Sequence, residues 1–479
     1  MSDSNSNSLE YLFHPRSIAL VGITTANPGH WTRTFLDSLI AFQFEGPIYL
    51  VNPKGGEING LKVHQSLRDI PNNIDYVIGL VPARESPRLV EECAGKGVRA
   101  IHFCTAGFSE TGEDEPIRLE AEVVRLARKH RIRIIGPNCM GIYSPKSRLS
   151  FMPAFPKESG PVGAISQSGG NANYIVRLGA QRGVRFSKVI SYGNACDYNE
   201  SDFLDYLATD PDTKIIGMYV EGLRDGEKFR RALEKATREK PVILLKGGLT
   251  DGGARAAAGH TASLAGSKAT WEALARQLGV IFVETLDEMI DVMVTLLFMS
   301  VPKGRNAVVI GSGGGASVLI TDEFERKGLK VPQLPKEIIR EIRQFIPAAG
   351  NILRNPVDLS QNMTESDSVR RAVTLASQWD GIDFLVKFLR TGQVPQPHIF
   401  KEHLTRMMEG FSVENGGSSK PSVIVVDPSI VPEEASIVYD FIQQCLSSGL
   451  PVYYSFGSAA NAINEVLSYY ESRQRRLGT

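Results

Sequence analysis

One histidine stands in a segment that has almost no large side chains. Residues 247–266 read GGLTDGGARAAAGHTASLAG, and twelve of these twenty residues are Gly or Ala, with His260 as the only imidazole. Imidazole exchanges protons near neutral pH and can accept a phosphoryl group. Because a long loop inside a compact domain is usually functional or disordered, we expect residues 247–266 to form a mobile arm that presents His260.

A carboxylate follows an apolar run earlier in the chain. Glu221 comes directly after MYV in the segment MYVEGLRDG. At the end of a strand its carboxylate could accept a hydrogen bond from one nitrogen of His260, which would fix the tautomer and leave the other nitrogen as the nucleophile. A glutamate at a turn that faces water explains the same pattern equally well.

Three glycine-rich loops follow strand-like runs, namely VGITTANPGHW at 21–31, ISQSGGNAN at 165–173 and IGSGGGASV at 310–318. Backbone N–H groups at a helix N-terminus bind anions, so each loop is a candidate phosphate site. For any one loop, a simple tight turn is the stronger interpretation, but three such loops weaken it. The first loop lacks the second glycine of GxGxxG, which disfavours NAD.

Further candidates lie where the strand-like runs of the first third end. Lys54 follows one of them and could meet a phosphate, although a lone lysine there is usually a solvated charge. The segments 104–107, CTAG, and 136–139, GPNC, end two others. The carboxyl ends of an open α/β sheet line its ligand crevice, so we expect these segments to share one crevice.

Composition excludes several classes of protein. The chain has 479 residues, 42% of them hydrophobic and 22% charged, with 53 Lys plus Arg against 53 Asp plus Glu. This balance gives no general attraction to nucleic acid or to a membrane. Five cysteines without a CxxC pair and histidines without ligand spacing predict neither a disulfide framework nor a metal site. The N-terminus lacks the features of a signal peptide, and we expect a cytoplasmic protein.

The order of apolar runs predicts an α/β fold with parallel sheets. Strand-like runs alternate with helix-length segments, and the rhythm breaks near residues 145–160 and 298–305. We therefore expect about three domains, in keeping with the usual domain size. The predicted divisions are a disordered tail at 1–10 and domains at 11–150, 151–300 and 301–479.

Several long motifs occur in a fixed order along the chain. They are VNPKGGEINGLKV, KGVRAIHFCTAGFSE, RIIGPNCMG, VGAISQSGG, SYGNACDYNESDFLDYLATDPDTKIIGMYVEG, ARAAAGHTASLAG and NPVDLS. Together they resemble the NDP-forming acyl-CoA synthetase superfamily, which includes succinyl-CoA ligase and ADP-forming acetate–CoA ligase. The domain order is similar to that of the α subunit of the latter type. It implies a Rossmann-like CoA-binding domain followed by two flavodoxin-like ligase domains, the first of which carries the phosphohistidine loop.

The resemblance also implies roles for residues. His260 would be phosphorylated and Glu221 would orient its ring. The phosphate would lie between two helix N-termini formed by Ser168, Gly169, Gly170, Gly313, Gly314 and Gly315. Coenzyme A would contact Gly22, Thr24, Thr25, Asn27, Lys54, Thr105, Ala106 and Asn138, although ITTANPGHW stands where relatives commonly carry Ser and Arg.

The implied reaction is the reversible conversion of acyl-CoA, phosphate and ADP to a carboxylic acid, CoA and ATP through an acyl phosphate and a phosphohistidine. No segment resembles the ATP-grasp domain that binds ADP or ATP with Mg in this superfamily. We therefore expect a separate ATP-grasp β subunit, an α2β2 assembly, and no nucleotide turnover by this chain alone.

Two alternatives stay open. A non-catalytic CoA-binding or regulatory protein could use the same fold, although it would not need a histidine arm. A dehydrogenase is the weaker alternative because of the missing glycine. The identity of the carboxylic acid, which could be acetate, a longer aliphatic acid or an aryl acid, is not fixed by any motif.

Overall fold

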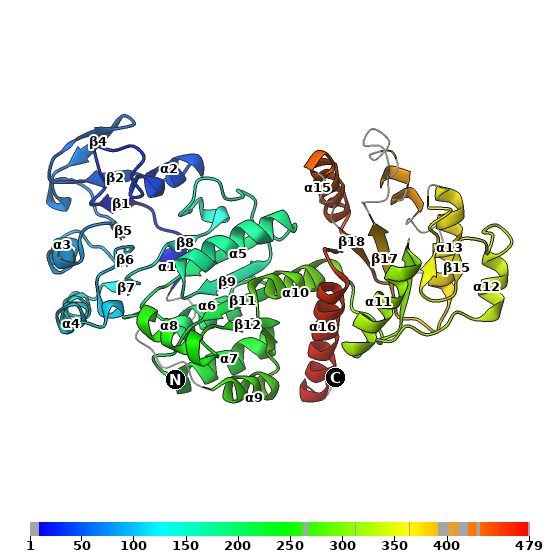
Figure 1. Ribbon diagram of the computed structural model, residues 1–479. Helices are drawn as coiled ribbons and strands as arrows, with labels where there is room; N and C mark the ends of the chain where they lie inside the picture. The colour runs from blue at the N-terminus through cyan, green and yellow to red at the C-terminus, as the bar shows by residue number, and fades with distance from the viewer. Residues whose placement is uncertain are drawn as a thin grey trace. The chain divides into compact units, whose positions relative to one another are not determined.

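The computed structural model describes most of the chain. The described residues are 9–261, 267–311, 313–363, 365–390, 402, 404–406, 408–410, 420–427 and 432–477, of which 257–261, 390, 427 and 432–434 are described by their backbone alone. The chain divides into two compact units, and the boundary lies between Met289 and Ile290 (Figure 1).

The first unit begins with a seven-stranded sheet in the order β3-β4-β2-β1-β5-β6-β7. Its strands are β1 (Ile18–Val21), β2 (Ile48–Val51), β3 (Gly56–Ile58), β4 (Leu61–His64), β5 (Tyr76–Gly79), β6 (Ala100–Phe103) and β7 (Arg133–Ile135). Its main helices are α2 (Arg33–Ala41), α3 (Ser86–Ala94) and α4 (Asp114–Lys129). The five predicted strands are confirmed and are parallel, and the hairpin of β3 and β4 is an addition at the sheet edge.

The second sheet of the first unit has six strands in the order β13-β12-β11-β9-β10-β8. They are β8 (Gly141–Tyr143), β9 (Val162–Ser166), β10 (Phe186–Ser191), β11 (Ile215–Val220), β12 (Val242–Lys246) and β13 (Ile281–Val283). The helices are α5 (Gly169–Gln181), α6 (Glu200–Thr209), α7 (Gly226–Glu239), α8 (Asp251–Thr261), α9 (Lys268–Leu278) and α10 (Leu286–Phe298), the last of which continues into the second unit. Only β8 is antiparallel, and it precedes the predicted division at residue 150.

The second unit holds a six-stranded sheet in the order β15-β16-β14-β17-β18-β19. The strands are β14 (Ala307–Gly311), β15 (Ile352–Leu353), β16 (Val357–Asp358), β17 (Phe384–Arg390), β18 (Ser422–Asp427) and β19 (Val452–Tyr453). The helices are α11 (Gly314–Arg326), α12 (Lys336–Ile342), α13 (Ser366–Gln378), α15 (Pro432–Ser447) and α16 (Phe456–Leu477). The protein is therefore an α/β protein with three mainly parallel sheets, as its sequence predicts.

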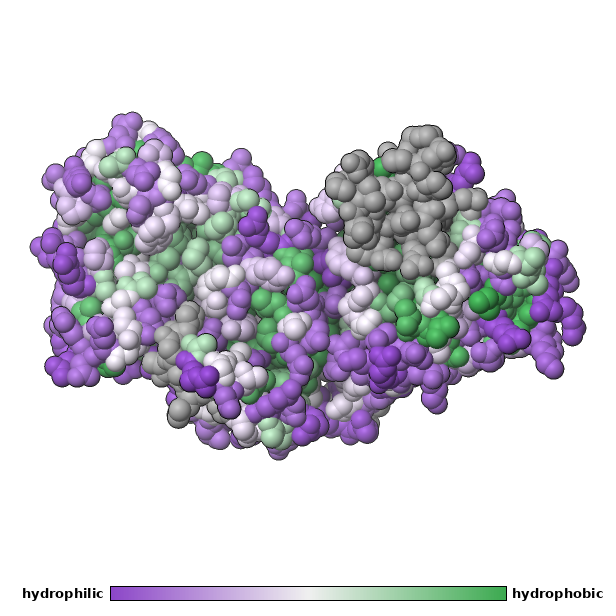
Figure 2. All heavy atoms as spheres, viewed as in Figure 1, coloured by the Kyte–Doolittle hydropathy of each residue, from purple (hydrophilic) through white to green (hydrophobic). Residues whose placement is uncertain are grey.

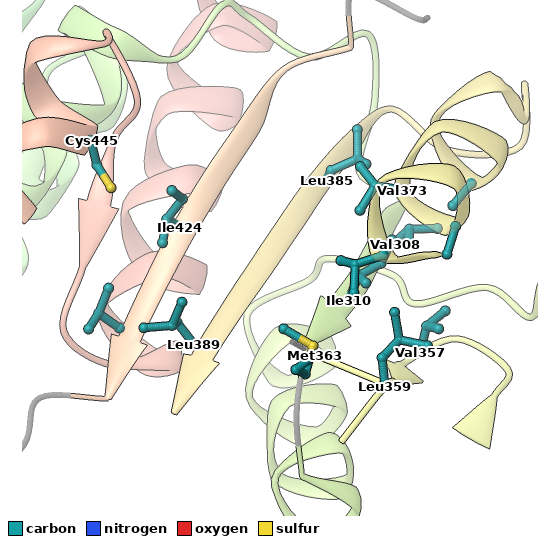
Figure 3. Close-up of a cluster of buried hydrophobic side chains, with 14 of the residues drawn as sticks. Val308, Ile310, Val357, Leu359, Met363, Val373, Leu385, Leu389, Ile424 and Cys445 are labelled. Carbon is teal, nitrogen blue, oxygen red and sulfur yellow. The ribbon is translucent and has the colours of Figure 1, made fainter. Parts of the chain in front are cut away.

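The core of the second unit lies between its sheet and the helices that cover one face. Figure 3 shows Val308, Leu385 and Ile424 projecting from adjacent strands, with Val373 of α13 and Cys445 of α15 packed nearby. All five are at most 1% exposed. Burying a side chain of the size of leucine or valine contributes roughly 1.5–3 kcal/mol, so this cluster fixes the sheet that positions the first turn of α11.

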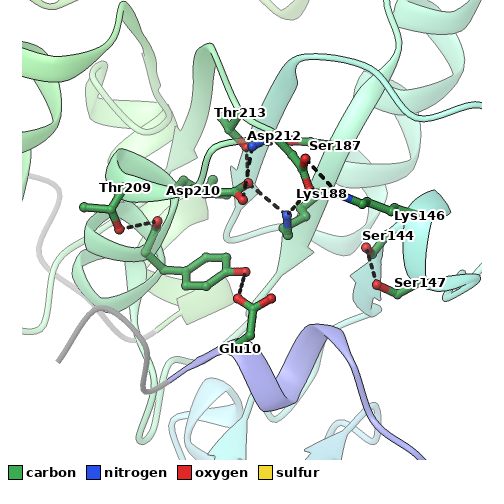
Figure 4. A network of polar contacts seen from close by, with 12 residues as sticks. Glu10, Ser144, Lys146, Ser147, Ser187, Lys188, Thr209, Asp210, Asp212 and Thr213 are labelled. Carbon is green, nitrogen blue, oxygen red and sulfur yellow. Dashed lines mark hydrogen bonds and ion pairs between the residues drawn. The ribbon is translucent and has the colours of Figure 1, made fainter. Parts of the chain in front are cut away.

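A buried ion pair lies where α1 (Glu10–Phe13) meets the second sheet (Figure 4). Lys188 Nζ lies 2.9 Å from Asp210 Oδ2, and the two side chains are only 3% and 4% exposed. Tyr206 Oη donates to Glu10 Oε2 over 2.7 Å, and its ring stacks on Phe13. These contacts attach the start of the described chain to β10 and α6, so both sheets of the first unit share one folded body.

The glycine- and alanine-rich segment is not a continuous loop. Residues Asp251–Thr261 form α8, so the expectation of a loop throughout 247–266 is wrong for these residues. Alanine has the highest helix propensity, and the backbone carbonyl and hydroxyl of Thr250 accept from the amides of Ala254 and Gly253, which caps the first turn. Residues 262–266 lie outside the described part of the chain.

The face of the molecule drawn in Figure 2 is mainly polar. Figure 2 shows hydrophilic side chains over much of the viewed face, with smaller apolar areas between them. Across the described ranges, no helix is long and apolar enough to cross a bilayer.

Candidate active site

Three neighbouring strands of the second sheet end at one place. Strands β9, β11 and β12 are parallel neighbours, so Gln167, Glu221 and Lys246 come to the same edge of the sheet. Gln167 Oε1 accepts from the amide of Glu221 over 2.7 Å and from that of Gly222 over 3.1 Å. The amide side chain of Gln167 thus fixes the backbone that carries Glu221.

The side chain of Glu221 is held inside the protein. It is 6% exposed, and Tyr219 Oη donates to its Oε1 over 3.1 Å. Burial raises the pKa of Tyr219, and the charge of Glu221 adds to the rise. Because a buried carboxylate needs partners, these contacts exclude the interpretation of Glu221 as a turn residue that faces water.

Lys246 joins this strand edge to the start of the histidine-bearing segment. Its Nζ donates to the carbonyl of Glu221 over 2.7 Å and also to that of Gly247, and it lies 5.5 Å from the centre of the Trp271 ring. Burial lowers the pKa of Lys246 to about 8, and the nearby charge of Glu221 opposes this effect. The ammonium group therefore fixes the chain where β12 ends.

The backbone of His260 lies in the last turn of α8, whereas its side chain lies outside the described residues. The predicted contact between His260 and Glu221 therefore stays a prediction. Helix α8 lies against the short 3₁₀ helix η4 (Ser109–Thr111), which follows β6 of the first sheet. The histidine-bearing helix thus lies beside the carboxyl end of the first sheet.

The first turn of α5 carries the predicted phosphate residues Ser168, Gly169 and Gly170. Ser168 is the N-cap, and its side chain accepts from the amide of Asn171 over 3.3 Å. At Gly169 a Cβ would lie 2.8 Å from Met140 Cγ, so a larger residue requires the Met140 side chain to move. The first amides of a helix have no partner within the helix, and this turn therefore offers donors to an anion.

The first turn of α11 carries Gly313, Gly314 and Gly315, and the amide of Gly313 already has acceptors. It donates to Asp358 Oδ1 over 2.8 Å and to Ser360 Oγ over 2.9 Å. Asp358 is 5% exposed and also accepts from the amide of Ser360. The motif NPVDLS therefore supplies a buried carboxylate to this helix end, a role that its sequence pattern does not reveal.

The predicted phosphate end of the CoA crevice lies on the loop after β1. Gly22 has φ of +97°, and a Cβ there would lie 2.7 Å from the carbonyl carbon of Leu80, so only glycine fits. Thr24 uses its amide and carbonyl within the loop, while Thr25 is half-buried. Asn27 and Lys54 are exposed, with the Asn27 side chain accepting from the amide of Gly29 and the Lys54 amide donating to Asn52.

The predicted thiol end of the crevice lies where β6 and β7 end. Thr105 Oγ1 donates to the carbonyl of Val81 over 2.6 Å, and the amide of Asn138 donates to the carbonyl of Thr105 over 3.0 Å. Ala106 is exposed beside them. Cys139 is buried, and burial raises the pKa of its thiol. The structure thus brings Thr105 and Asn138 together, with Cys139 packed behind them.

A polar junction that the sequence pattern did not reveal joins the ends of the two sheets. Asn194 Nδ2 donates to Glu110 over 2.6 Å and to Glu120 over 3.0 Å. Arg224 donates to the carbonyl of Asn194 over 2.9 Å and contacts Glu120 Oε1 at 3.4 Å. Arg224 follows Glu221 by three residues, so this junction links the Glu221 loop to the loop after β6.

The sequence pattern also did not reveal that Glu200 and Tyr192 are buried polar residues near the end of β10. Glu200 opens α6 and Tyr192 follows β10, and both are buried. A charged residue within NESDFLD is typical of a helix start that faces water, so only the packing reveals the burial of Glu200.

Three family models match successive parts of the chain. They are the CoA binding domain at residues 16–145, the succinyl-CoA ligase like flavodoxin domain at 159–296 and the ligase-CoA domain at 307–452. The α subunit of acetate–CoA ligase [ADP-forming] II from Pyrococcus furiosus is 36% identical over 449 residues, which are 93% of this chain and 94% of that protein. This chain belongs to the family of ADP-forming acetate–CoA ligases.

Solved structures in this family have the same fold. The dinucleotide forming acetyl-coenzyme A synthetase 1 of Ca. Korarchaeum cryptofilum, in complex with phosphate and ADP, matches with a TM-score of 0.81 and 30% identity, over 98% of this chain and 99% of that chain. Acetate–CoA ligase [ADP-forming] I of Archaeoglobus fulgidus is 36% identical over 383 residues. Those residues are 80% of this chain but only 55% of that longer relative.

The second unit of this family member contains a cavity of about 440 Å³ at the carboxyl ends of its sheet. The lining residues are Gly315, Ala316, Leu319, Phe388, Val425, Tyr454, Ser455 and Phe456. Ligands of open α/β sheets bind at this end. The cavity therefore offers mostly apolar space beside the first turn of α11.

Proposed function

We propose that this chain is the phosphohistidine-bearing α-type subunit of an ADP-forming acyl-CoA ligase. The observation that carries the proposal is the position of Glu221, which is buried at a strand end and held by Gln167 and Tyr219. It lies in the same folded unit as α8, whose last turn includes His260. A fixed carboxylate and a histidine on a separate short helix suit the transfer of a phosphoryl group between two sites.

In the proposed reaction, a phosphate oxygen attacks the thioester carbonyl of acyl-CoA, the C–S bond breaks, and the thiolate takes a proton to give CoA. A neutral nitrogen of His260 then attacks the phosphorus of the acyl phosphate, and the P–O bond to the acyl group breaks to release the carboxylate. An oxygen of the ADP β-phosphate finally attacks the phosphohistidine, and the N–P bond breaks to give ATP. The covalent intermediate divides one exchange into easier steps.

The residues of the chain have distinct parts in this proposal. Glu221 accepts from the second nitrogen of His260 and stabilises the positive charge that the ring gains. The open amides at the first turn of α5 hold the phosphoryl oxygens, as helix N-termini do. The crevice of the first sheet holds CoA beside the loop after β1, where Gly22 allows the backbone to pass close to that of Leu80.

The nucleotide site belongs, in this proposal, to an ATP-grasp β subunit, which would supply Mg with ADP or ATP in an α2β2 assembly. Two features of the relatives support a partner. One relative is named as a subunit α, and another is much longer than this chain.

The experiment is incubation of the purified chain with acetyl-CoA and radiolabelled phosphate. We expect an acid-labile label that is absent from His260→Ala and strongly reduced in Glu221→Gln. His130→Ala is the matched control, because His130 contacts Glu91 on the surface of α3 and should not affect labelling. A label that persists in His260→Ala would contradict the proposal, and titrations in which the chain binds CoA without ever being labelled would favour a non-catalytic CoA-binding protein.

A further inference from the structure

The tyrosine that holds Glu221 also touches the start of the histidine-bearing segment. Tyr219 Oη donates to Glu221 Oε1 over 3.1 Å. The same oxygen occupies the space in which a side chain at Gly247 would begin, because a Cβ added there would lie 2.7 Å from Oη, 3.2 Å from Cζ and 3.4 Å from Cε2. The phenol of Tyr219 therefore packs directly on the backbone of Gly247.

The backbones at both ends of this contact are fixed by the sheet. The carbonyl of Tyr219 accepts from the amide of Gln167 over 3.0 Å, which ties β11 to the turn after β9. The amide of Gly247 donates to the carbonyl of Val220 over 2.9 Å, which ties the end of β12 to β11. Because both backbones are hydrogen-bonded at strand ends, the phenol and Gly247 keep a fixed relation.

The connection from Gly247 to α8 is short and packed. Gly248 has φ of +77°, which turns the chain at the end of β12. Helix α8 begins at Asp251, and a Cβ added at Gly253 in its first turn would lie 3.2 Å from the Cα of Gly248. The start of α8 thus rests on the connection, and its position depends on how the chain leaves β12 at Gly247.

We propose that Tyr219 is a positioning residue that orients the Glu221 carboxylate and, through Gly247, sets the path of the chain into α8. This inference rests on the proposed function, in which α8 carries the reacting histidine. Lys246 supports the same link from the backbone, since its Nζ donates to the carbonyls of both Glu221 and Gly247. Close-packed groups transmit displacements to their neighbours, so the carboxylate and the helix take their positions together.

The glycine at position 247 is needed for this contact and not for its backbone conformation. Gly247 does not have the left-handed φ of Gly248, so its backbone allows alanine. The methyl group of Gly247→Ala would displace Tyr219 Oη and so weaken the hydrogen bond to Glu221, which depends on distance and angle. Tyr219→Phe removes that hydrogen bond and also removes the atom that lies nearest to the added methyl group.

The test is a double-mutant cycle on the maximal rate of labelling by radiolabelled phosphate. It uses whichever of acetyl-CoA, a longer aliphatic acyl-CoA and an aryl acyl-CoA labels the wild type fastest. Tyr219→Phe should slow labelling about tenfold, because it removes a hydrogen bond to a charged acceptor, and Gly247→Ala should slow it by about as much. The double variant should stay within about threefold of Tyr219→Phe, since both changes break one contact.

The matched control is Gly252→Ala in the first turn of α8. A Cβ added at Gly252 meets only Arg255 Nη2, at 3.9 Å, so this variant should label within about twofold of the wild type. The acyl-CoA concentration that gives half the maximal rate should also stay within about twofold in every variant, because a positioning role acts on the reaction and not on substrate binding.

Three results would overturn the inference. Effects that multiply, with the double variant about a hundredfold slower than the wild type, would show that Tyr219 and Gly247 act independently. Labelling of Tyr219→Phe at the wild-type rate would remove the positioning role. A change confined to the half-saturating acyl-CoA concentration would place the effect on binding instead. Should Gly247→Ala fail to fold, the double variant should fold, and failure of both would likewise contradict the account.

Proteolysis separates this inference from the proposed function. Arg255 is exposed on α8, and trypsin cleavage after it, followed by mass spectrometry, reports how often α8 opens. Gly247→Ala should raise this cleavage rate at least about fivefold in the wild-type background but less than about twofold in the Tyr219→Phe background. Cleavage after Arg238 of α7, whose side chain is 66% exposed, is the control for general unfolding and should not change.

The two readouts fail in different ways. If no acyl-CoA labels the wild type but the cleavage rates follow the expected pattern, the proposed function fails and the link between Tyr219 and α8 stands. Equal increases in cleavage after Arg255 in both backgrounds would overturn the inference whatever the labelling result.

Discussion

In both the second and the third sheet, a central strand runs into a glycine-rich turn and then into a helix, α5 after β9 and α11 after β14. One carboxylate is buried beside each of these sheets, Glu200 in the second and Asp358 in the third, but the two differ in their hydrogen-bond partners. Glu200 of the second sheet has none in the described part of the chain, whereas Asp358 of the third accepts from Gly313 and Ser360. The difference indicates that Asp358 has a structural role at the start of α11 that the Glu200 carboxylate does not have at the start of α6.

The largest expected effect concerns the pH dependence of stability at Glu200. The pKa is about 7 in the folded protein and near 4.5 in the unfolded chain, so between these pH values unfolding releases a proton and rising pH favours unfolding. Relative to Glu200→Gln, the wild type should lose about 3 kcal/mol of unfolding free energy from about pH 4.5 to about pH 7, and no more above that. Denaturant titrations of both proteins at several pH values measure this difference.

Equal slopes of stability against pH in the wild type and Glu200→Gln would show that Glu200 is ionised in the folded protein. The contrast between the two carboxylates would then be lost.

The next largest effect on stability is expected at Asp358, whose carboxylate accepts hydrogen bonds from the amides of Gly313 and Ser360. Asp358→Asn should lower the free energy of unfolding of the second unit by about 2 kcal/mol, because it weakens hydrogen bonds made to a charged acceptor. Chemical denaturation measures the loss, with Asp367→Asn on the exposed start of α13 as the control. If Asp358→Asn leaves stability unchanged but alters phosphate labelling, Asp358 acts in the reaction and the comparison fails.

A smaller effect is expected at the glycines that open α11. Gly313 has φ of +116°, so Gly313→Ala should cost about 1–2 kcal/mol through backbone strain. Gly315 lies in the first turn of the same helix, and a Cβ added there would meet no atom within 4 Å, so Gly315→Ala should be neutral or stabilising by up to about 1 kcal/mol. Thermal unfolding of the two variants gives the comparison, and similar melting temperatures would rule out strain at Gly313.

The smallest effect is expected at the N-cap of α5. Ser168→Ala removes the acceptor for the amide of Asn171 and should cost about 1 kcal/mol. Ser168→Asn restores a capping acceptor and should recover stability. If the Ser168 hydroxyl also contacts the phosphate, the asparagine variant should recover stability but not the labelling rate, and recovery of both would limit Ser168 to capping.

Much of the fold follows from the sequence because buried parallel strands are short apolar runs. The runs that became β1, β9, β11 and β14 are fully buried strands or nearly so, and the three α/β series are present. The helix α8 was missed because small residues suggest a loop, while the run of alanines around Arg255 favours a helix. The hairpin of β3 and β4 was missed because its strands are short and polar.

The site was only partly predictable for a related reason. Glu221 and Ser168 follow adjacent parallel strands of the second sheet, whose carboxyl ends lie together, and Gly22 follows a strand of the first sheet. The partners of a side chain depend on distant segments, as when Asn194 joins Glu110 and Glu120. The lack of partners at Glu200 is likewise a result of packing, and no local pattern encodes it.

The most direct test of the central claim is to locate the phosphoryl group on the protein. The wild-type chain is labelled with acetyl-CoA and radiolabelled phosphate, digested under alkaline conditions that preserve phosphohistidine, and the labelled peptide is sequenced by mass spectrometry. We predict a single labelled peptide that contains His260, with the phosphoryl group on its imidazole. A label on any other residue would contradict the account, as would the absence of label from acetyl-CoA, a longer aliphatic acyl-CoA and an aryl acyl-CoA in a folded chain that binds CoA.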